Sequence, residues 1–283
     1  MTAAIAPGAI RRAFRHPSFA IGAGLTALLV LVALVSLIWT PYSPYEIDMA
    51  AKLAEPSGGH WFGQDQLGRD ILSLAMAGAQ NSIMVGVIAV GVGLTLGMIL
   101  GAIATAEGGW VEELVMRFSD LTFAFPAILS AIMFTAVFGP GIVVSIIAIG
   151  IFNIPIFARV TQASAKAIWA REYTTAARAA GKSRARITID HVLPNILSAL
   201  TVQGTIQFAN AILWEASLSY LGFGTQPPHP SWGRMLNDAQ AHMFDAPWLA
   251  IYPGVAIMLA VLGLNLLGDG LRDLLDPRLV RSR

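Results

Sequence analysis

Long apolar runs without charge are the feature of this sequence that most constrains its fold. Residues 19–39 form 21 consecutive positions without a charged side chain. As a helix, such a run covers about 32 Å, enough to cross a hydrocarbon layer of about 30 Å. Arginines precede the run, but it is longer than the apolar region of a signal peptide, and no A-x-A cleavage pattern follows. We therefore expect a retained membrane-spanning helix.

Five more apolar stretches follow, at residues 82–105, 118–138, 141–158, 196–218 and 248–268. The whole chain is 55% hydrophobic and only 12% charged, whereas soluble domains carry roughly 25% charged residues. Asp120 and Glu215 each lie within a turn of an end of their stretch, so neither is expected at mid-bilayer. Prolines inside spans are tolerated because neighbouring helices can satisfy the freed carbonyls. The sequence predicts an all-α polytopic membrane protein with six transmembrane helices.

The distribution of basic residues predicts the orientation of these spans. Of the 18 Lys and Arg residues, 15 lie in the N-terminal segment, in 106–117, in 159–195 and in 269–283. These segments all fall on one side of the predicted membrane. Because cytoplasmic loops carry an excess of Lys and Arg, both termini are expected in the cytoplasm. The longest cytoplasmic loop is then 159–195.

Composition also excludes several function classes. The chain has no cysteine, and no two of its five histidines are spaced i, i+4, so we expect no metal site. A net charge of +1 gives no reason to expect nucleic acid as a partner. No nucleophile, base or metal constellation is visible. We expect that the chain is not an enzyme and binds no cofactor.

The triplet Gly181-Lys182-Ser183 ends like a phosphate loop, G-x-x-x-x-G-K-[ST], but Ala176 stands where the first glycine belongs. The preceding residues are alanine-rich and favour a helix instead of a buried strand. Gly181 is then expected to cap that helix at its C-terminus, and Ser183 to cap a second helix that stops before Pro194. The sequence predicts a helix-turn-helix on the cytoplasmic surface.

One face of the first predicted helix carries small side chains. Glu172, Ala176 and Ala180 follow at i, i+4 and i+8, with Ala177 and Ala179 beside them. Small side chains on one face permit close approach of another protein. The alternative, that this face packs on the chain's own helix ends, is equally compatible with the pattern.

The same stretch resembles a known loop. The run Glu172-x3-Ala176-Ala177-x3-Gly181, followed by Leu193-Pro194, resembles the EAA loop of permease subunits in bacterial ABC importers. The resemblance implies that the loop docks into a cleft of an ATPase subunit. The general pattern has isoleucine where this chain has His191, which is similar to the "RH-x-LPN" variant of peptide permeases, although Asp190 replaces the arginine.

Residues 60–73, 215–236 and 265–279 resemble signatures of the C-type permease of dipeptide, oligopeptide and nickel importers. This resemblance implies a multi-pass subunit of the bacterial inner membrane that forms the pathway with a second, homologous permease. Two separate ATPase subunits would bind ATP and Mg, and a periplasmic or lipid-anchored binding protein would deliver the substrate.

Di- and oligopeptides are the first substrates that the resemblance suggests. Nickel complexes or another small solute are the alternative. A rival of a different class is an ion-coupled secondary transporter, which would need ionisable residues near mid-membrane. The expected organisation is an N-terminal segment, 1–81, and a permease core, 82–283, with five transmembrane helices and the EAA loop at 159–195.

Polar residues inside the spans are candidates for lining the pathway, namely Asn153, Gln203, Gln207, Asn210 and Asn265. Polar groups avoid lipid, but hydrogen bonds between helices explain them equally well. Two G-x-x-x-G spacings, Gly93 to Gly97 and Gly97 to Gly101, favour close helix packing.

Overall fold

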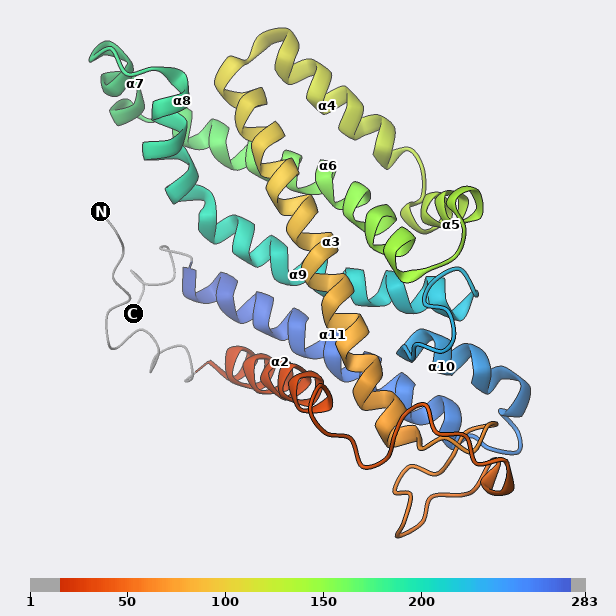
Figure 1. Ribbon diagram of the computed structural model, residues 1–283. Coiled ribbons are helices and arrows are strands. Elements are labelled where there is room, and N and C mark those ends of the chain that lie inside the picture. Colours follow the sequence, from red (N-terminus) through yellow and green to blue (C-terminus); the bar gives the residue numbers. More distant parts are fainter. Residues whose placement is uncertain (1–15, 276–283) are drawn as a thin grey trace.

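The computed structural model describes residues 16–275, and the regular elements within that range are helices. The longer ones are α2 (Pro17–Ser36), α3 (Ile71–Glu107), α4 (Gly109–Phe123), α5 (Ala127–Phe138), α6 (Ile142–Trp169), α7 (Glu172–Ala179), α9 (Leu193–Tyr220), α10 (Trp232–Ala239) and α11 (Trp248–Leu275) (Figure 1). Short elements are the 3-10 turns Met49–Ala51 and Gln240–His242, α8 (Arg184–Ile187) and the π-helix Thr188–Val192.

Five helices of the described range are long and apolar enough to cross a membrane: α2, α3, α6, α11 and the continuous helix Arg184–Tyr220. They confirm five of the six predicted spans. The third prediction, 118–138, was wrong as a single helix, because α4 and α5 meet at a bend of 84°. Counted together, this pair gives a sixth, broken span. Both chain termini, which are predicted to be cytoplasmic, lie outside the described residues.

The bend is located at Pro126, which precedes α5 with an extended backbone (ψ 123°). Proline lacks the N–H that would continue the helix ladder, and its ring disfavours helical geometry in the residue before it. The placement of Asp120 also changes. Since α4 begins at Gly109, Asp120 lies in the last turn of α4 and not at the start of a span.

Helices α3 and α6 pack with their backbones close together. A β-carbon on Gly97 would lie 2.5 Å from the Ile154 carbonyl oxygen, and one on Gly101 would lie 2.4 Å from the Ala158 carbonyl oxygen. Glycine is required at these positions because any side chain would push α6 away. The helix packing predicted from the two G-x-x-x-G spacings is therefore confirmed.

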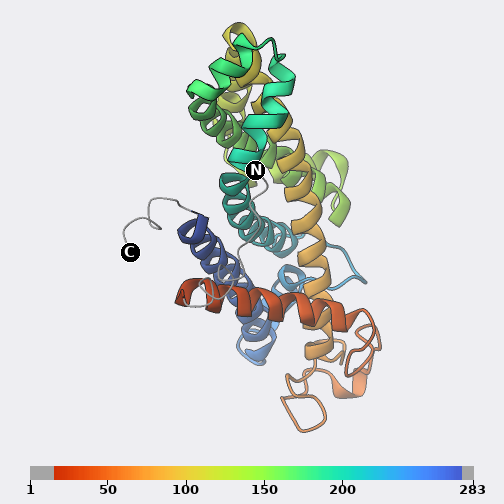
Figure 2. The same ribbon diagram turned by 90° about the vertical axis from the view of Figure 1, so that its left-hand side faces the viewer.

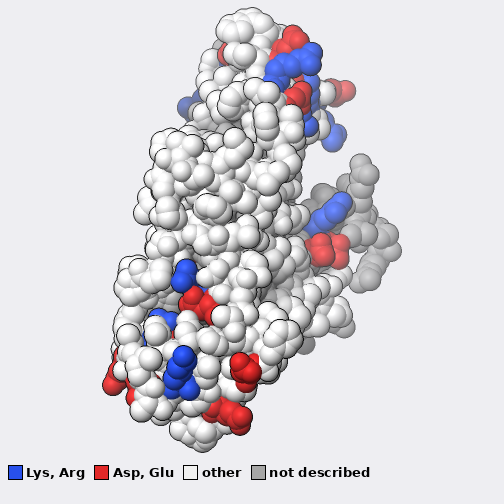
Figure 3. Space-filling model, turned by 90° about the vertical axis from the view of Figure 1, so that its right-hand side faces the viewer, with Lys and Arg blue, Asp and Glu red and all other residues white. Residues whose placement is uncertain are grey.

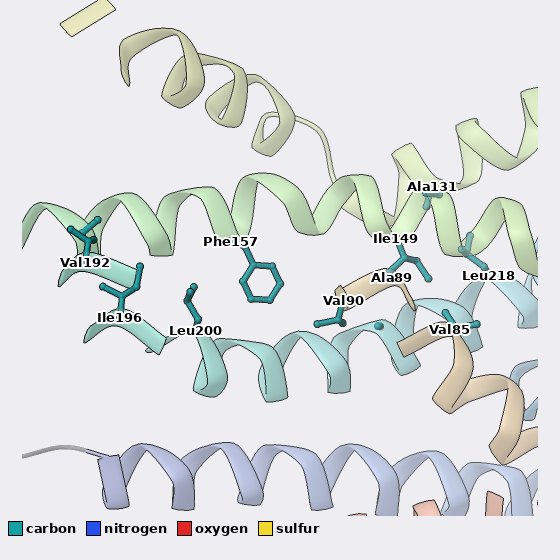
Figure 4. Close-up of a cluster of buried hydrophobic side chains, with 13 residues drawn as sticks. Val85, Ala89, Val90, Ala131, Ile149, Phe157, Val192, Ile196, Leu200 and Leu218 are labelled. Carbon is teal, nitrogen blue, oxygen red and sulfur yellow. The ribbon is translucent and has the colours of Figure 1, made fainter. Parts of the chain in front are cut away.

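The largest apolar cluster lies where α3, α5, α6 and α9 meet. Figure 4 shows Val85, Ile149, Phe157, Leu200 and Leu218 within it, and Phe157 is fully buried. On the other side of α9, α2 and α11 pack on each other through small residues (Figure 1). Helix α2 runs obliquely to α3 (Figure 2).

The molecular surface has the distribution expected of a membrane protein. Figure 3 shows most charged atoms toward the two ends of the face it displays, with a broad uncharged band between them. Many large apolar side chains of the spans are exposed, among them Leu31, Val87, Ile103 and Ile251. An apolar band of this size suits contact with acyl chains.

The two ends of the molecule carry different loops. Helices α7 and α8 lie at one end, and α10 lies at the other together with the loop between α2 and α3 (Figure 1). The loop between α2 and α3 is compact. Gly68 has a φ of 73°, and a β-carbon there would lie 1.8 Å from the Asp48 carbonyl oxygen. Asp65 is buried, and its carboxylate accepts the backbone N–H groups of Leu67 and Arg69.

Candidate functional site

Helix α7 is fixed to the end of α6. The buried Thr174 hydroxyl contacts the carbonyl oxygens of Trp169 at 2.9 Å and Arg171 at 2.6 Å. The guanidinium of Arg178 lies 5.5 Å from the centroid of the Trp169 ring, within the range of a cation–π interaction. The predicted alanine-rich helix before Gly181 is α7, and Ala170 and Arg171 separate it from the end of α6.

The end of α7 is closed by a glycine-capped turn. Gly181 has a φ of 82°, its N–H donates to the Arg178 carbonyl at 3.0 Å, and the N–H of Lys182 donates to the Ala177 carbonyl at 3.1 Å. This pair of bonds is the Schellman motif, which requires a left-handed residue that glycine adopts without strain. The predicted role of Gly181 as helix cap is confirmed.

Ser183 caps the next helix as predicted, since its side chain accepts the N–H of Arg186 at 3.3 Å. The prediction that this helix stops before Pro194 was wrong. Helix α8 passes through the π-helix Thr188–Val192 into α9. Pro194 lies in the first positions of α9, where a missing N–H is tolerated, and the wide π-turn accommodates the change.

The small face of α7 is uncovered by the rest of the described chain. Glu172, Ala176 and Ala180 are exposed, and Ala177 is half-buried. This face therefore does not pack on the described ends of the chain's own helices, as the alternative interpretation required. Leu193 and Pro194 follow at the start of α9, half-buried and exposed respectively.

Charged side chains next to the turn bind one another. The carboxylate of Asp190 accepts from Lys182 Nζ at 3.3 Å and from Arg186 Nε at 2.9 Å. The Lys182 Nζ also lies 3.3 Å from His191 Nε2. The Arg186–Asp190 spacing of i, i+4 was the only signal of this network in the sequence. Lys182 follows a helix and not a strand, so the surroundings of a phosphate loop are missing at this position.

A second contact ties the segment to α3. The guanidinium of Arg184 donates to the Glu107 carboxylate at 2.9 Å and to the Glu107 carbonyl oxygen at 3.1 Å. Glu107 is the last residue of α3. No sequence pattern signals this pair, because the two residues are far apart in the chain and meet only after α6 and α7 have folded back.

The pathway candidates lie in different surroundings. Asn153 is fully buried, and its Nδ2 donates to the Ile149 carbonyl at 3.0 Å, as expected for a residue inside a helix contact. Gln207 is buried on α9 and lies 3.5 Å from Asn210, while Gln203 is half-buried. Asn265 is exposed on α11.

This architecture, with its multiple spans and an uncovered surface segment at one end, defines a multi-pass α-helical membrane protein. The profile of the family described as binding-protein-dependent transport system inner membrane component matches residues 93–281. The chain belongs to this family. It is a permease subunit of a binding-protein-dependent ABC importer, a transport component and not an enzyme.

Individual proteins agree with the family. The chain is 43% identical to the dipeptide transport system permease protein DppC of Alkalihalophilus pseudofirmus, over 88% of this chain and 82% of that protein. It is 44% identical to the glutathione transport system permease protein GsiD of Escherichia coli, over 95% of this chain and 89% of that protein. A chain of the MetNI methionine ABC transporter in an inward-facing conformation has the same fold, with a TM-score of 0.60 and 16% identity over 72% of this chain and 97% of that chain.

Proposed function

We propose that this permease imports di- or oligopeptides. The observation that carries the substrate class is the identity of 43% and 44% to permeases whose names specify dipeptide and glutathione, over most of each chain. Both are peptides, so the shared chemistry is a short backbone with charged ends. Nickel complexes and other small solutes are the alternative substrates, and the uptake experiment below distinguishes them from peptides.

The proposed assembly contains four kinds of component. This chain and a second, homologous permease form the pathway in a bacterial inner membrane, and two ATPase subunits bind ATP and Mg on the cytoplasmic side. A periplasmic or lipid-anchored binding protein delivers the peptide. The family description, which names a binding-protein-dependent system and an inner membrane component, supports this arrangement.

The proposed coupling surface is the exposed face of α7 with the turn that follows it. Glu172 and Ala176 would enter a cleft of the ATPase subunit, because small exposed side chains permit a close approach. Ala177 and Gly181 hold the turn in shape through the backbone bond from Lys182 to the Ala177 carbonyl. Leu193 and Pro194 carry the motion into α9.

Coupling follows from population shift. Nucleotide binding to the ATPase dimer favours one arrangement of α7, and the spans respond by alternating between outward-facing and inward-facing states. The permease core, 82–283, would contain the helices that alternate between the two states, and the family match at 93–281 lies within it. Residues 1–81 would form an additional N-terminal segment. Helix α3 itself begins at Ile71, before that boundary.

Polar residues of α6 and α9 are proposed contacts of the pathway. On α9 these are Gln203, Gln207 and Asn210. Asn153 on α6 is fully buried between helices, so it would reach the pathway only after α6 moves.

Uptake by the reconstituted complex tests the proposal. Proteoliposomes carry the two permeases and both ATPases, with binding protein and radiolabelled dialanine outside and ATP inside. We expect accumulation of dialanine that requires ATP and binding protein. Uptake driven by an ion gradient without ATP would contradict the importer assignment for this complex. ATP-dependent uptake of a nickel complex, with none of dialanine or glutathione, would contradict the peptide assignment.

A further inference from the structure

Helix α4 has two edges of opposite chemistry. One edge is apolar and exposed, and its residues are Trp110, Leu114, Phe118 and Leu121. A second edge is charged, and its residues are Glu113, Arg117 and Asp120. The spacings within each set are those of neighbours on a helix surface. A helix of this kind meets an apolar medium on one side and a polar one on the other.

The charged edge continues onto α6. Arg159, Gln162 and Lys166 follow at i, i+3 and i+7 and share one face. Arg159 forms an ion pair with Asp120, and Lys166 Nζ lies 2.5 Å from Glu112 Oε1. Gln162 donates to the same Glu112 carboxylate. We call the set Glu112, Glu113, Arg117, Asp120, Arg159 and Lys166 the α4–α6 charged strip.

The Asp120–Arg159 pair lies deep along these helices. The apolar run of α6 from Ile142 to Ala158 covers about 26 Å, less than the roughly 30 Å of a hydrocarbon core. Arg159 therefore lies at or inside the inner edge of that core. It is level with Gly101 of α3, whose β-carbon would meet the carbonyl oxygen of the adjacent Ala158. From Arg159 to the end of α6 at Trp169 is a further distance of about 15 Å.

The pair is nevertheless open to its surroundings. The side chain of Arg159 is 45% exposed and that of Asp120 is 50% exposed. Charged groups at this depth avoid acyl chains and face either water or another protein surface. The apolar edge of α4 supplies the surface that suits lipid, and the charged edge presents its groups on a different side of the same helix.

We infer that the α4–α6 charged strip lines the cytoplasmic half of the path and contacts the charged ends of a peptide. The peptide ammonium group pairs with Asp120, and the peptide carboxylate pairs with Arg159. This inference rests on the proposed peptide import. The strip has three acidic and three basic groups, paired as Glu112–Lys166, Glu113–Arg117 and Asp120–Arg159. The two ends of a zwitterion replace the two members of one such pair. Phe123, whose ring centroid lies 4.9 Å from the Arg159 guanidinium carbon, holds the guanidinium in place.

Thiol accessibility tests whether the strip faces water. The chain contains no cysteine, so a single introduced thiol is the only one that it offers. Asp120→Cys and Leu121→Cys are neighbours at the same depth but on different edges of α4. In the reconstituted, nucleotide-free complex, a membrane-impermeant methanethiosulfonate should modify Asp120→Cys about tenfold faster than Leu121→Cys. Slow modification of both would overturn the inference. Arg117→Cys and Phe118→Cys repeat the comparison if Asp120→Cys does not assemble.

Ligand protection and uptake test the cargo contact. Dialanine, supplied with binding protein and ATP, should slow modification of Arg117→Cys several-fold, and N-acetyl-dialanine amide should not. Uptake of dialanine by Arg159→Gln should fall about tenfold and recover with Arg159→Lys, which restores the charge. The control is Arg234→Gln, which breaks an Arg–Asp ion pair within α10, away from the strip. Fast, unprotected modification together with normal uptake by Arg159→Gln would overturn the cargo contact. Failure of dialanine uptake by the wild-type complex would instead contradict the proposed substrate, and the accessibility comparison would still stand.

Discussion

A β-carbon built on Gly93 of α3 would lie 2.2 Å from the β-carbon of Asn153 on α6. The two helices thus meet at a position where only a hydrogen atom fits. The Asn153 Nδ2 donates to the Ile149 carbonyl of its own helix, so the contact with Gly93 is one of shape. The closeness of these two residues sets the spacing of α3 and α6, which form the most extensive helix pair of the described chain.

Substitution at Gly93 should therefore destabilise the protein. Gly93→Leu forces α3 and α6 apart, at a cost of about 3 kcal/mol or more, because both backbones have to move. Gly91→Leu is the matched control, since a β-carbon at Gly91 has open space around it. Thermal unfolding in detergent should show a lower Tm for Gly93→Leu than for Gly91→Leu. Equal values for the two variants would contradict the observed packing.

Replacement of Gly181 should uncouple transport while leaving the chain in the membrane. A side chain at φ 82° is strained, at a cost of about 1–2 kcal/mol, and the turn that presents α7 loosens. We expect Gly181→Leu to abolish uptake and substrate-dependent ATP hydrolysis, with normal membrane insertion. Gly181→Asn should retain more activity, because asparagine tolerates the left-handed region.

A bulky residue at Ala177 should have the same functional effect through a different cause. Ala177 is half-buried beside the turn, so Ala177→Trp obstructs the surface that meets the ATPase. Capture of the ATPase subunit by the tagged permease in mild detergent measures the effect directly. Normal capture and normal uptake by both Ala177→Trp and Gly181→Leu would exclude α7 as the coupling surface.

The isolated chain should not bind ATP. Lys182 lies beside Asp190 and His191, and its backbone follows a helix, so the converging N–H groups of a phosphate loop are missing there. Equilibrium dialysis of the purified chain with radiolabelled ATP should show no saturable binding. Binding that disappears in Lys182→Ala would refute the prediction.

Topology can be read with the same cysteine-free background. Basic residues predict that the α7 segment is cytoplasmic and the segment with α10 is external. Phe244 is 99% exposed near α10, so Phe244→Cys should react with an impermeant maleimide added to spheroplasts. Ser183→Cys should react only after the membrane is opened. The reverse pattern would invert the proposed orientation.

Sequence reasoning predicted the features that depend on local chemistry. Apolar runs indicated the spans, and the glycine at position 181 indicated a left-handed cap, since few other residues adopt that conformation. Ser183 was likewise identified as a cap from its side chain alone. These predictions needed no knowledge of distant parts of the chain.

Features that depend on neighbours in space were out of reach. Pro155 and Pro253 lie inside continuous helices, whereas the chain turns by 84° at Pro126. Proline thus lies within a helix in two places and at a bend in a third. Neighbouring helices decide which occurs, because they can satisfy the carbonyl group that proline leaves without a hydrogen bond. Arg159 and Asp120 meet only through the antiparallel packing of α4 and α6, and no local pattern connects them.

Helix α3 has a mechanical consequence. Its 37 residues extend about 55 Å and include no proline, so it behaves as a single stiff rod. Arg184 holds one end at Glu107, and the compact loop after α2 surrounds the other end at Ile71. A tilt applied at Glu107 is then a tilt at Ile71 as well. A movement of the Glu107 end is passed to the Ile71 end by the helix itself, so no series of side-chain contacts is needed to connect the two sides of the bilayer.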